Sequence, residues 1–547
     1  MDERVRVFHN GNVFDGRRHL PGAAVAVQDA RVVAAGPAEQ VLAMFERPEL
    51  VDLRGGLLLP GFHDAHLHPL TGGLERLRCE LTELESVDDY LAAIRDHGGP
   101  PGPEGWVRGG GWSVDLFGPQ GPTAALLDAV VPDRPAFIVS SDHHNAWVNT
   151  RALEVAGVDA RTSDPPDGWI ERDGDGNPTG TLREAAVLLV QQHVRTSREE
   201  NAAALREAQA YLHSWGLTGW HDALIGGYAG LDDPTEAYLD LHAAGRLTAH
   251  VTASLWWDRH RGPEQIDDLL AVSRELREAG LGAGSVKMMM DGIAETFTAA
   301  VEEPYLADTG CPCGQHGLSF LDRQQATDAV VALDAAGFQV HVHAIADRAV
   351  HSALDAFAAA RAANGRTGAR HQIAHLQLVR PEDRARFAEL EVTANVQGMW
   401  VDSSSAAVRL VVPMLGPERA SWHYPFADIA SAGAHLAGGS DWPVNPPEPV
   451  AAVHALVNRS PWAPDGDPAE PLVPAQALTL QQALTAYTSG SAWVCGHEDS
   501  GRIAPGAGAD LVVLDRDPFL GAADEIGASR VVATYVEGQR VHVRDEA

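Results

Sequence analysis

The most informative stretch of this sequence is Leu57-Leu-Leu-Pro-Gly-Phe-His-Asp-Ala-His66-Leu-His68-Pro69. It begins with an apolar run of the length of a buried strand and ends with two histidines. Because residues i and i+2 of a strand point to the same face, the rings of His66 and His68 can converge on one ion. In a barrel, this strand end would lie at the carboxyl-terminal face, where active sites are found. Alone, however, a His-x-His pattern is more often two satisfied polar residues at a strand end.

Eight short apolar runs separated by helical stretches predict an α/β fold, a (β/α)8 TIM barrel built on a parallel sheet. The runs begin near Leu57, Leu217, His250, Ser285, Phe338, His371, Val392 and His435. Helices are expected between them, for example over residues 184–215, 263–279 and 323–336. Eight such units favour a barrel over an open sheet.

The interval between the first two predicted strands is too long for a simple βα loop. We therefore expect an inserted, partly folded region over about residues 71–183, rich in Gly, Pro and Trp. The two ends of the chain have the alternating pattern and turn residues of short strands. They predict one small β-sandwich domain built from residues 1–56 and 496–547, beside a barrel domain over residues 57–495.

Composition excludes several classes of function. Hydrophobic residues make up 45% of the chain and charged residues 21%, which is typical of a globular protein rather than a disordered one. The formal net charge of −34 repels phosphate backbones and anionic membranes, so we expect no nucleic-acid or membrane partner. High solubility is a simpler reason for this charge than an acidic-partner role.

The N-terminus lacks the apolar segment of a signal peptide, and no uncharged run is long enough to span a bilayer. We therefore expect a cytoplasmic protein, with the oligomeric state left open and a homodimer admissible. Four cysteines are too few for a disulfide scaffold. Cys311 and Cys313 could form a metal pair, but no second cysteine pair joins them, which favours a loop with two free thiols.

Four later residues stand at predicted strand ends and change the interpretation of the His-x-His pattern. Lys287 lies among apolar residues of the fourth strand, where a lysine either snorkels or has a chemical role. His343 ends the fifth strand, His375 ends the sixth, and Asp441 follows the eighth. In a barrel these strand ends all open at one rim, and coincidence is improbable for the whole ordered set.

Further motifs are spread over nearly the whole chain. They are Pro60-Gly-Phe-His-Asp-Ala-His-Leu-His68, Pro132-Asp-Arg-Pro135, Asp142-His-His-Asn-Ala-Trp-Val-Asn149, Gly176-Asn-Pro-Thr-Gly-Thr-Leu-Arg-Glu184, Gly216-Leu-Thr-Gly-Trp-His-Asp222, Gly439-Ser-Asp-Trp-Pro-Val444 and Ala509-Asp-Leu-Val-Val-Leu-Asp-Arg-Asp-Pro-Phe519. With these motifs the chain resembles the amidohydrolase family 3 branch of the amidohydrolase superfamily. That branch includes the N-substituted formamide deformylases, and its substrates are diverse.

The resemblance implies a first metal bound by His66 and His68, with Asp441 contacting it and serving as general base. A general base here would pass a proton toward the leaving nitrogen. Two departures from the family pattern leave these ligands intact. Ala346 stands where many relatives have Gly, and Ala374 stands where many have Glu, which puts support of the neighbouring ligand in doubt.

The resemblance also implies that Lys287 is carboxylated and bridges to a second metal held by His343 and His375. A free ammonium group cannot bind a cation, whereas a lysine carbamate is anionic and has two oxygens. Two cations sharing a hydroxide lower its pKa and polarise a carbonyl group. One or two zinc ions suit these ligands, and Mn, Fe or Co are admissible.

Three residues are candidates for substrate binding: Trp112, His144 and Asp291. They could reach the pocket from the insert and from the loop after the fourth strand. For His144, substrate contact and a structural hydrogen bond are equally good interpretations, and for Trp112 packing is favoured. Three further histidines are expected behind the ligands or in the core: His63, His221 and His341.

The sequence therefore predicts an enzyme that hydrolyses a C–N bond, in an amide or formamide of a small molecule, with a metal-activated hydroxide. One alternative is the same centre acting on an ester or a cyclic amide. Another is a catalytically inactive metal-binding or assembly protein. The intact ligand set argues against the inactive protein, because inactive relatives usually lose ligands.

Overall fold

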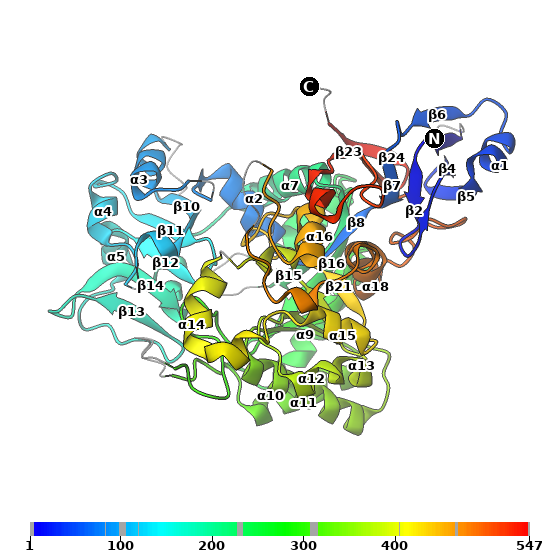
Figure 1. The fold of residues 1–547 in the computed structure, drawn as a ribbon. Helices are drawn as coiled ribbons and strands as arrows, with labels where there is room; N and C mark the ends of the chain where they lie inside the picture. The colour runs from blue at the N-terminus through cyan, green and yellow to red at the C-terminus, as the bar shows by residue number, and fades with distance from the viewer. Residues whose placement is uncertain are drawn as a thin grey trace.

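A computed structural model describes residues 5–82, 84–97, 105–118, 120–226, 233–306, 315–403, 405–464 and 469–544. At its centre is an eight-stranded parallel sheet (Figure 1). The strands are, in spatial order, β8 (Phe62–Leu67), β15 (Leu217–Ile225), β16 (His250–Trp256), β17 (Gly282–Met289), β18 (Gln339–Ala344), β19 (Gln372–His375), β20 (Thr393–Val396) and β21 (Leu436–Gly438). The edge strands β21 and β8 contact each other, so the sheet closes into the predicted TIM barrel.

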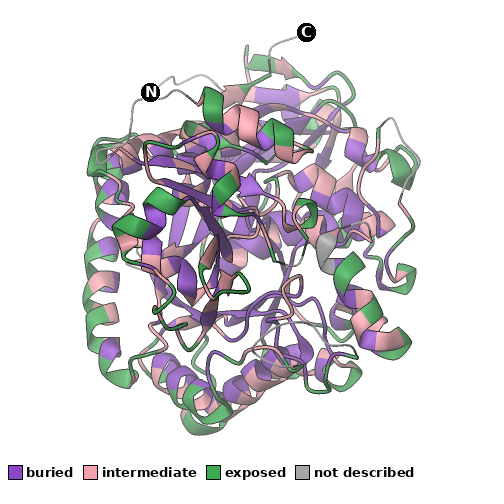
Figure 2. Ribbon diagram, turned by 90° about the vertical axis from the view of Figure 1, so that its left-hand side faces the viewer, coloured by how far each residue is buried: buried purple, intermediate pink, exposed green. Residues whose placement is uncertain are grey.

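Helices surround the barrel with apolar faces turned inward and polar faces outward, as Figure 2 shows by burial. The main ones are α7 (Arg198–Ser214), α8 (Thr235–Ala243), α9 (Ile266–Glu278), α10 (Arg323–Ala335), α11 (Asp347–Asn364), α15 (Phe426–Ser431) and α16 (Pro449–Asn458). In α10 the buried residues follow helical spacing: Ala326, Ala329, Val330 and Leu333. Asp322 starts this helix by accepting a hydrogen bond from the Gln325 backbone N–H.

The strand expected to open the barrel near Leu57 belongs elsewhere. Residues Leu57–Pro60 form β7, which pairs with β2 (Asn12–Phe14) and β22 (Leu511–Leu514) outside the barrel. The first barrel strand is β8, which begins at Phe62 after the turn at Gly61. One continuous apolar run therefore supplies two strands, because both are fully buried and no polar residue separates them.

The two ends of the chain build mixed sheets beside the barrel. One has the order β5 (Arg31–Pro37), β4 (Ala23–Gln28), β1 (Arg6–His9) and β6 (Glu49–Asp52). The other has the order β24 (Gln539–Val543), β23 (Val531–Val536), β22, β7, β2 and β3 (His19–Leu20). Residues of both sheets form one apolar core, for example Phe8, Val25, Leu58 and Val513. The N- and C-terminal segments therefore fold together.

The insertion follows β8 and the short helix α2 (Pro69–Leu77), and Figure 1 places it at the side of the barrel away from the terminal sheets. Its six-stranded sheet has the order β13 (Gly168–Arg172), β14 (Pro178–Glu184), β12 (Asn145–Val148), β11 (Ala136–Ser140), β10 (Val107–Trp112) and β9 (Cys79–Glu80). The single helix expected over residues 184–215 is interrupted: a short helix α6 (Leu188–Gln191) precedes α7. None of the described helices is long and apolar enough to cross a membrane.

His213, at the end of α7, makes stability depend on pH. Its Nδ1 lies 2.8 Å from the Leu217 carbonyl and its Nε2 lies 2.9 Å from the Thr248 hydroxyl. Burial lowers the pKa of His213 from 6.5 to about 4. Below pH 6.5 the unfolded chain takes up a proton that the folded chain refuses, so the free energy of unfolding falls until pH reaches about 4.

We expect this residue to contribute about 3 kcal/mol of that acid-induced loss. His213→Gln removes the titrating group, so its melting temperature should fall less than that of the unchanged protein between pH 7 and pH 4.5. Thermal unfolding of both proteins at the two pH values measures the difference. Parallel losses in the two proteins would contradict the assignment.

Candidate metal centre

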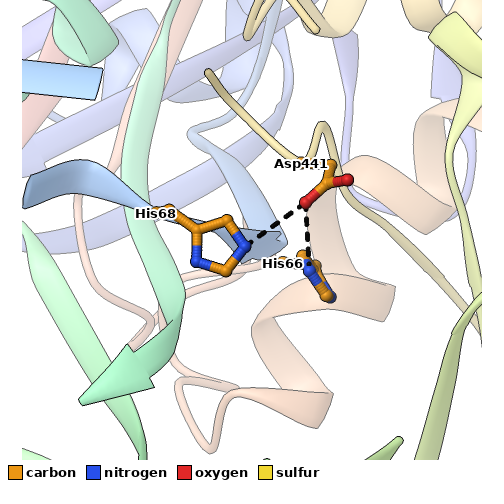
Figure 3. A group of neighbouring side chains, drawn as sticks. All are labelled: His66, His68 and Asp441. Carbon is orange, nitrogen blue, oxygen red and sulfur yellow. Dashed lines mark ion pairs between the residues drawn. The ribbon is translucent and has the colours of Figure 1, made fainter. Parts of the chain in front are cut away.

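The two histidines of the His-x-His motif lie at the carboxyl end of β8, where they face Asp441 (Figure 3). The Nε2 atoms of His66 and His68 lie 3.2 Å and 3.4 Å from Oδ1 of Asp441. One potential ligand atom from each of these three residues lies within 4.8 Å of the others. This geometry lets one cation contact all three side chains.

The loop after β21 holds Asp441 in place through backbone contacts with the end of β8. The Asp441 N–H donates to the His66 carbonyl at 2.8 Å, and the His68 N–H donates to the Trp442 carbonyl at 2.8 Å. Asp441 has a φ of 65°, a left-handed value that costs energy for a residue with a side chain. A Cβ added at Gly439 would lie 2.6 Å from Oδ1 of Asn395, so a larger residue there would require the buried Asn395 side chain to shift.

Lys287, His343 and His375 stand on β17, β18 and β19 and face the same cavity. Lys287 Nζ lies 3.4 Å from His66 Nε2. The ring centres of His343 and His375 are 4.3 Å apart, and His375 Nδ1 lies 3.8 Å from Asp441 Oδ2. The structure thus brings all six predicted ligands together at one rim. Lys287 is also the only lysine in the whole sequence, which marks it out independently of its position on a strand.

The charge states of these residues suit metal binding. Burial lowers the pKa of His66, His68, His343 and His375, so their rings are neutral near pH 7 and each offers a lone pair. Burial raises the pKa of Asp441, but the hydrogen bond to His68 and the charges around it lower this pKa overall to about 2. The centre therefore combines neutral imidazoles with an ionised carboxylate.

A direct sign that these residues fit a cation comes from His375. It is buried, with 6% of its surface exposed, and neither ring nitrogen has a hydrogen-bond partner among the described residues. Leaving a buried polar atom unsatisfied costs about 1–3 kcal/mol. Its φ of 77° is also left-handed, so backbone strain accompanies this placement. A metal bound to the ring would satisfy one nitrogen and offset part of that cost.

The cavity over these residues is shared between the barrel rim and the insert. His144 lines it and places its Nδ1 2.8 Å from Glu184 Oε2. Burial lowers the pKa of His144, but the charge and hydrogen bond of Glu184 raise it overall to about 9. The ring is therefore cationic at neutral pH. His144 thus makes the structural hydrogen bond and also lines the pocket, and its contact with substrate stays a prediction.

The other two substrate-binding candidates lie outside the cavity lining. Trp112 is fully buried in the core of the insert, and its Nε1 donates to the Ile138 carbonyl at 2.9 Å. Asp291 is also fully buried and accepts backbone hydrogen bonds from Ala300, Ile345 and Ala346. Trp112 therefore has the packing role that was favoured for it, and Asp291, a candidate for substrate contact, instead holds the turn that follows His343.

Sequence reasoning missed two acidic groups near the ligands. Asp64 accepts hydrogen bonds from the backbone of His66 at 2.9 Å and of Ser440 at 3.0 Å, which ties β8 to the Asp441 loop. Glu75 lines the cavity, with its Oε1 3.2 Å from His143 Nε2. An acidic residue inside an apolar run was the available signal for Asp64. Nothing local marks Glu75, because its partner comes from the insert. Cys311 and Cys313 lie outside the described residues.

Comparison with known proteins agrees with this geometry. The sequence model of the amidohydrolase family matches residues 49–542. The chain belongs to the amidohydrolase family. The resemblance drawn from its motifs is thus confirmed, and the match covers the barrel, the insert and, in the terminal sheets, the strands from β6 onward of this amidohydrolase.

Relatives match over nearly the full length. The chain is 30% identical to the protein LONG AFTER FAR-RED 3 of Arabidopsis thaliana, over 97% of this chain and 91% of the relative. It is 28% identical to the N-substituted formamide deformylase of Arthrobacter pascens, over 95% of each protein. A solved structure of an uncharacterized metal-dependent hydrolase from Pyrococcus horikoshii OT3 superposes with a TM-score of 0.71 at 26% identity, covering 95% of this chain and 99% of that one.

Proposed function

We propose that this amidohydrolase is a metal-dependent hydrolase that cleaves a C–N bond in an amide or formamide of a small molecule. The observation that carries the proposal is the convergence of His66, His68, Asp441, Lys287, His343 and His375 at one rim of the barrel. The similarity to a formamide deformylase over almost the whole chain supports the choice of bond. The cavity walls come from both barrel and insert, which suits a small substrate.

The ligands divide into two groups. His66, His68 and Asp441 would hold one divalent cation, with zinc suited to these ligands. His343 and His375 would hold a second, bridged to the first by Lys287 as a carbamate. Cations bound there would supply Lewis-acid polarisation of a carbonyl group and would lower the pKa of water.

The chain's own residues complete the chemistry. Asp441 is ionised and is held beside the ligands, so it can accept a proton and pass it to the leaving nitrogen. His144 presents a cationic N–H donor group at the cavity wall, suited to an oxygen of the substrate. Most other side chains on the wall are apolar, for example Leu224, Trp256 and Phe320, and would exclude water from the reacting groups.

A substrate panel tests the proposal. Zinc-loaded protein is incubated with N-substituted formamides, longer-chain amides, a cyclic amide and an ester of matched size, and released amine, acid and alcohol are quantified. We expect the highest kcat/KM for a formamide or amide, with amine and acid released in equal amounts. Preference for the ester or the cyclic amide would replace the proposed bond, and no turnover of any member would favour an inactive metal-binding protein.

His144→Gln should change substrate preference without removing metal. The substitution keeps a hydrogen-bonding side chain but removes the positive charge, and hydrogen bonds to charged groups contribute about 1.5–3 kcal/mol. We expect kcat/KM for the preferred substrate to fall about 10–100-fold, with metal content unchanged. His260→Gln is the matched control, because that side chain is 68% exposed. Equal kinetics of the two variants would remove His144 from the substrate site.

A further inference from the structure

Directly beneath the candidate ligands, the barrel interior is polar where a packed apolar core would be expected. His341 Nε2 lies 2.8 Å from Nδ1 of His66, the ring nitrogen that faces away from Asp441. His341 Nδ1 lies 3.4 Å from the Ser254 hydroxyl, which in turn lies 2.8 Å from His221 Nε2. All of these side chains are completely buried. Such a network is stable only if every donor meets an acceptor, so the positions of its protons can be deduced.

The deduction starts from the backbone carbonyl of Ala65, which can only accept a hydrogen bond. The Asn395 side-chain atom 3.2 Å from that oxygen must therefore be the amide nitrogen Nδ2, which donates to it. The same nitrogen lies 3.0 Å from Gln372 Oε1, which must accept its second hydrogen. Gln372 therefore turns its own N–H2 group toward His221 Nδ1, at 3.1 Å. His221 accepts there, and its ring proton is on Nε2.

The remaining protons follow in order. His221 Nε2–H donates to the Ser254 oxygen, and the Ser254 O–H donates to Ser285 Oγ at 2.9 Å. Ser254 then has a second lone pair for His341 Nδ1–H. His341 Nε2 is left as an acceptor for His66 Nδ1–H. This tautomer leaves the His66 Nε2 lone pair facing Asp441, as a metal ligand requires.

A competing order also exists. Gln372 Nε2 lies 3.4 Å from His341 Nδ1 and could donate to it. His341 would then donate to His66 Nδ1, and His66 would present an N–H to Asp441 at 3.2 Å. That order cannot bind a cation, because the lone pair of Nε2 is occupied by a proton. The Ser254 hydroxyl is the acceptor that stabilises the metal-binding order.

We propose that His341 and Ser254 are positioning residues that hold His66 in its metal-binding tautomer through a buried hydrogen-bond chain. This inference rests on the proposed metal dependence. It explains why the barrel keeps two uncharged histidines below the ligand layer: burial lowers the pKa of both, so each can act as a neutral donor and acceptor. The carbonyl of Ala65, the residue before His66, also takes part, because it fixes the orientation of the Asn395 amide at the other end of the hydrogen-bond chain.

The test measures zinc affinity by competition with a chelator, together with melting temperature. Ser254→Ala removes the acceptor for His341, and His341→Leu removes the acceptor for His66. We expect each to weaken zinc binding about 10–100-fold, the usual effect of losing a partner of a metal ligand. His341→Gln keeps an acceptor oxygen near His66 and should restore most of the affinity. Ser273→Ala is the matched control, a buried serine bonded to the Ala283 carbonyl outside the barrel interior.

A second measurement uses the unsubstituted protein, so it does not depend on whether the variants fold. Nitrogen-15 NMR of zinc-loaded protein with labelled histidines reports which ring nitrogen of each histidine carries the proton. We expect His221 to be protonated at Nε2 and His66 at Nδ1. Zinc affinities of the folded variants within twofold of the unchanged protein, or a His221 proton on Nδ1, would overturn the inference. Failure of the unchanged protein to bind zinc would instead refute the proposed function, so the two failures are distinguishable.

Discussion

Asp441→Asn should lower kcat by about two to four orders of magnitude, the usual range for loss of a general base. The substitution preserves the shape of the side chain but removes its charge. The carboxylate is free to accept a proton because its pKa of about 2 keeps it ionised near pH 7, and it is held 3.2 Å and 3.4 Å from the two histidines of the His-x-His motif. Steady-state kinetics on the best substrate of the panel measures the change.

Metal content must be determined in the same sample, since Asp441 is also a candidate ligand. Asp499→Asn is a suitable control, because that carboxylate is 63% exposed and pairs with the surface residues Arg31 and Arg502. A fall in kcat with full metal content supports the role as base, whereas a fall in both supports a role as ligand. Near-normal turnover by Asp441→Asn with metals bound would mean that the proton travels by another route.

Lys287→Ala should abolish most activity and reduce the number of bound metals. Lys287 is buried, with 3% of its surface exposed, and this burial lowers its pKa to about 8. The neutral amine, the form that reacts with carbon dioxide, is therefore accessible near neutral pH. We expect a loss of at least 100-fold, more than the loss of an outer partner of a metal ligand causes. Short carboxylates such as acetate or propionate should restore part of the activity by occupying the vacated space.

Because Lys287 is the only lysine of the chain, the carbamate can be observed directly. Protein equilibrated with carbon-13 bicarbonate should show one side-chain carbamate signal, and Lys287→Ala should lack it. Lys287→Arg is the stringent control: it keeps a positive charge, cannot form the carbamate, and leaves no space for a rescuing carboxylate. Full activity and full metal content in Lys287→Ala would exclude the bridge.

Much of the fold and the placement of the candidate ligands at one rim could be predicted from the sequence. The spacing of the apolar runs and the order of the polar residues that end them carry that information. Parallel barrel strands appear as short apolar runs, and a polar residue at the end of each run falls at a common rim. His343 and His375 were found in this way. The start of the first barrel strand was misplaced at Leu57, because β7 and β8 are both fully buried and read as one run.

What could not be predicted depends on contacts between distant segments. Trp112 and Asp291 are candidates for substrate contact because they neighbour the motifs, with packing favoured for Trp112, but the direction of a side chain within its element decides whether it reaches a cavity. Asp291 instead fixes backbone N–H groups more than fifty residues away along the chain. The buried hydrogen-bond chain that runs from Asn395 to His341 also depends on the register between neighbouring strands, which a single sequence does not reveal.

The most direct test of the central claim is metal content and turnover measured together. Protein stripped with a chelator is reloaded with zinc, and bound zinc per chain and kcat on the best formamide or amide are determined at each step. We predict that the unchanged protein loses activity on stripping and regains it as one or two ions bind, while His66→Asn with His68→Asn takes up fewer ions and stays inactive. Full turnover by stripped protein, or the same zinc uptake and turnover in the double variant, would contradict the account.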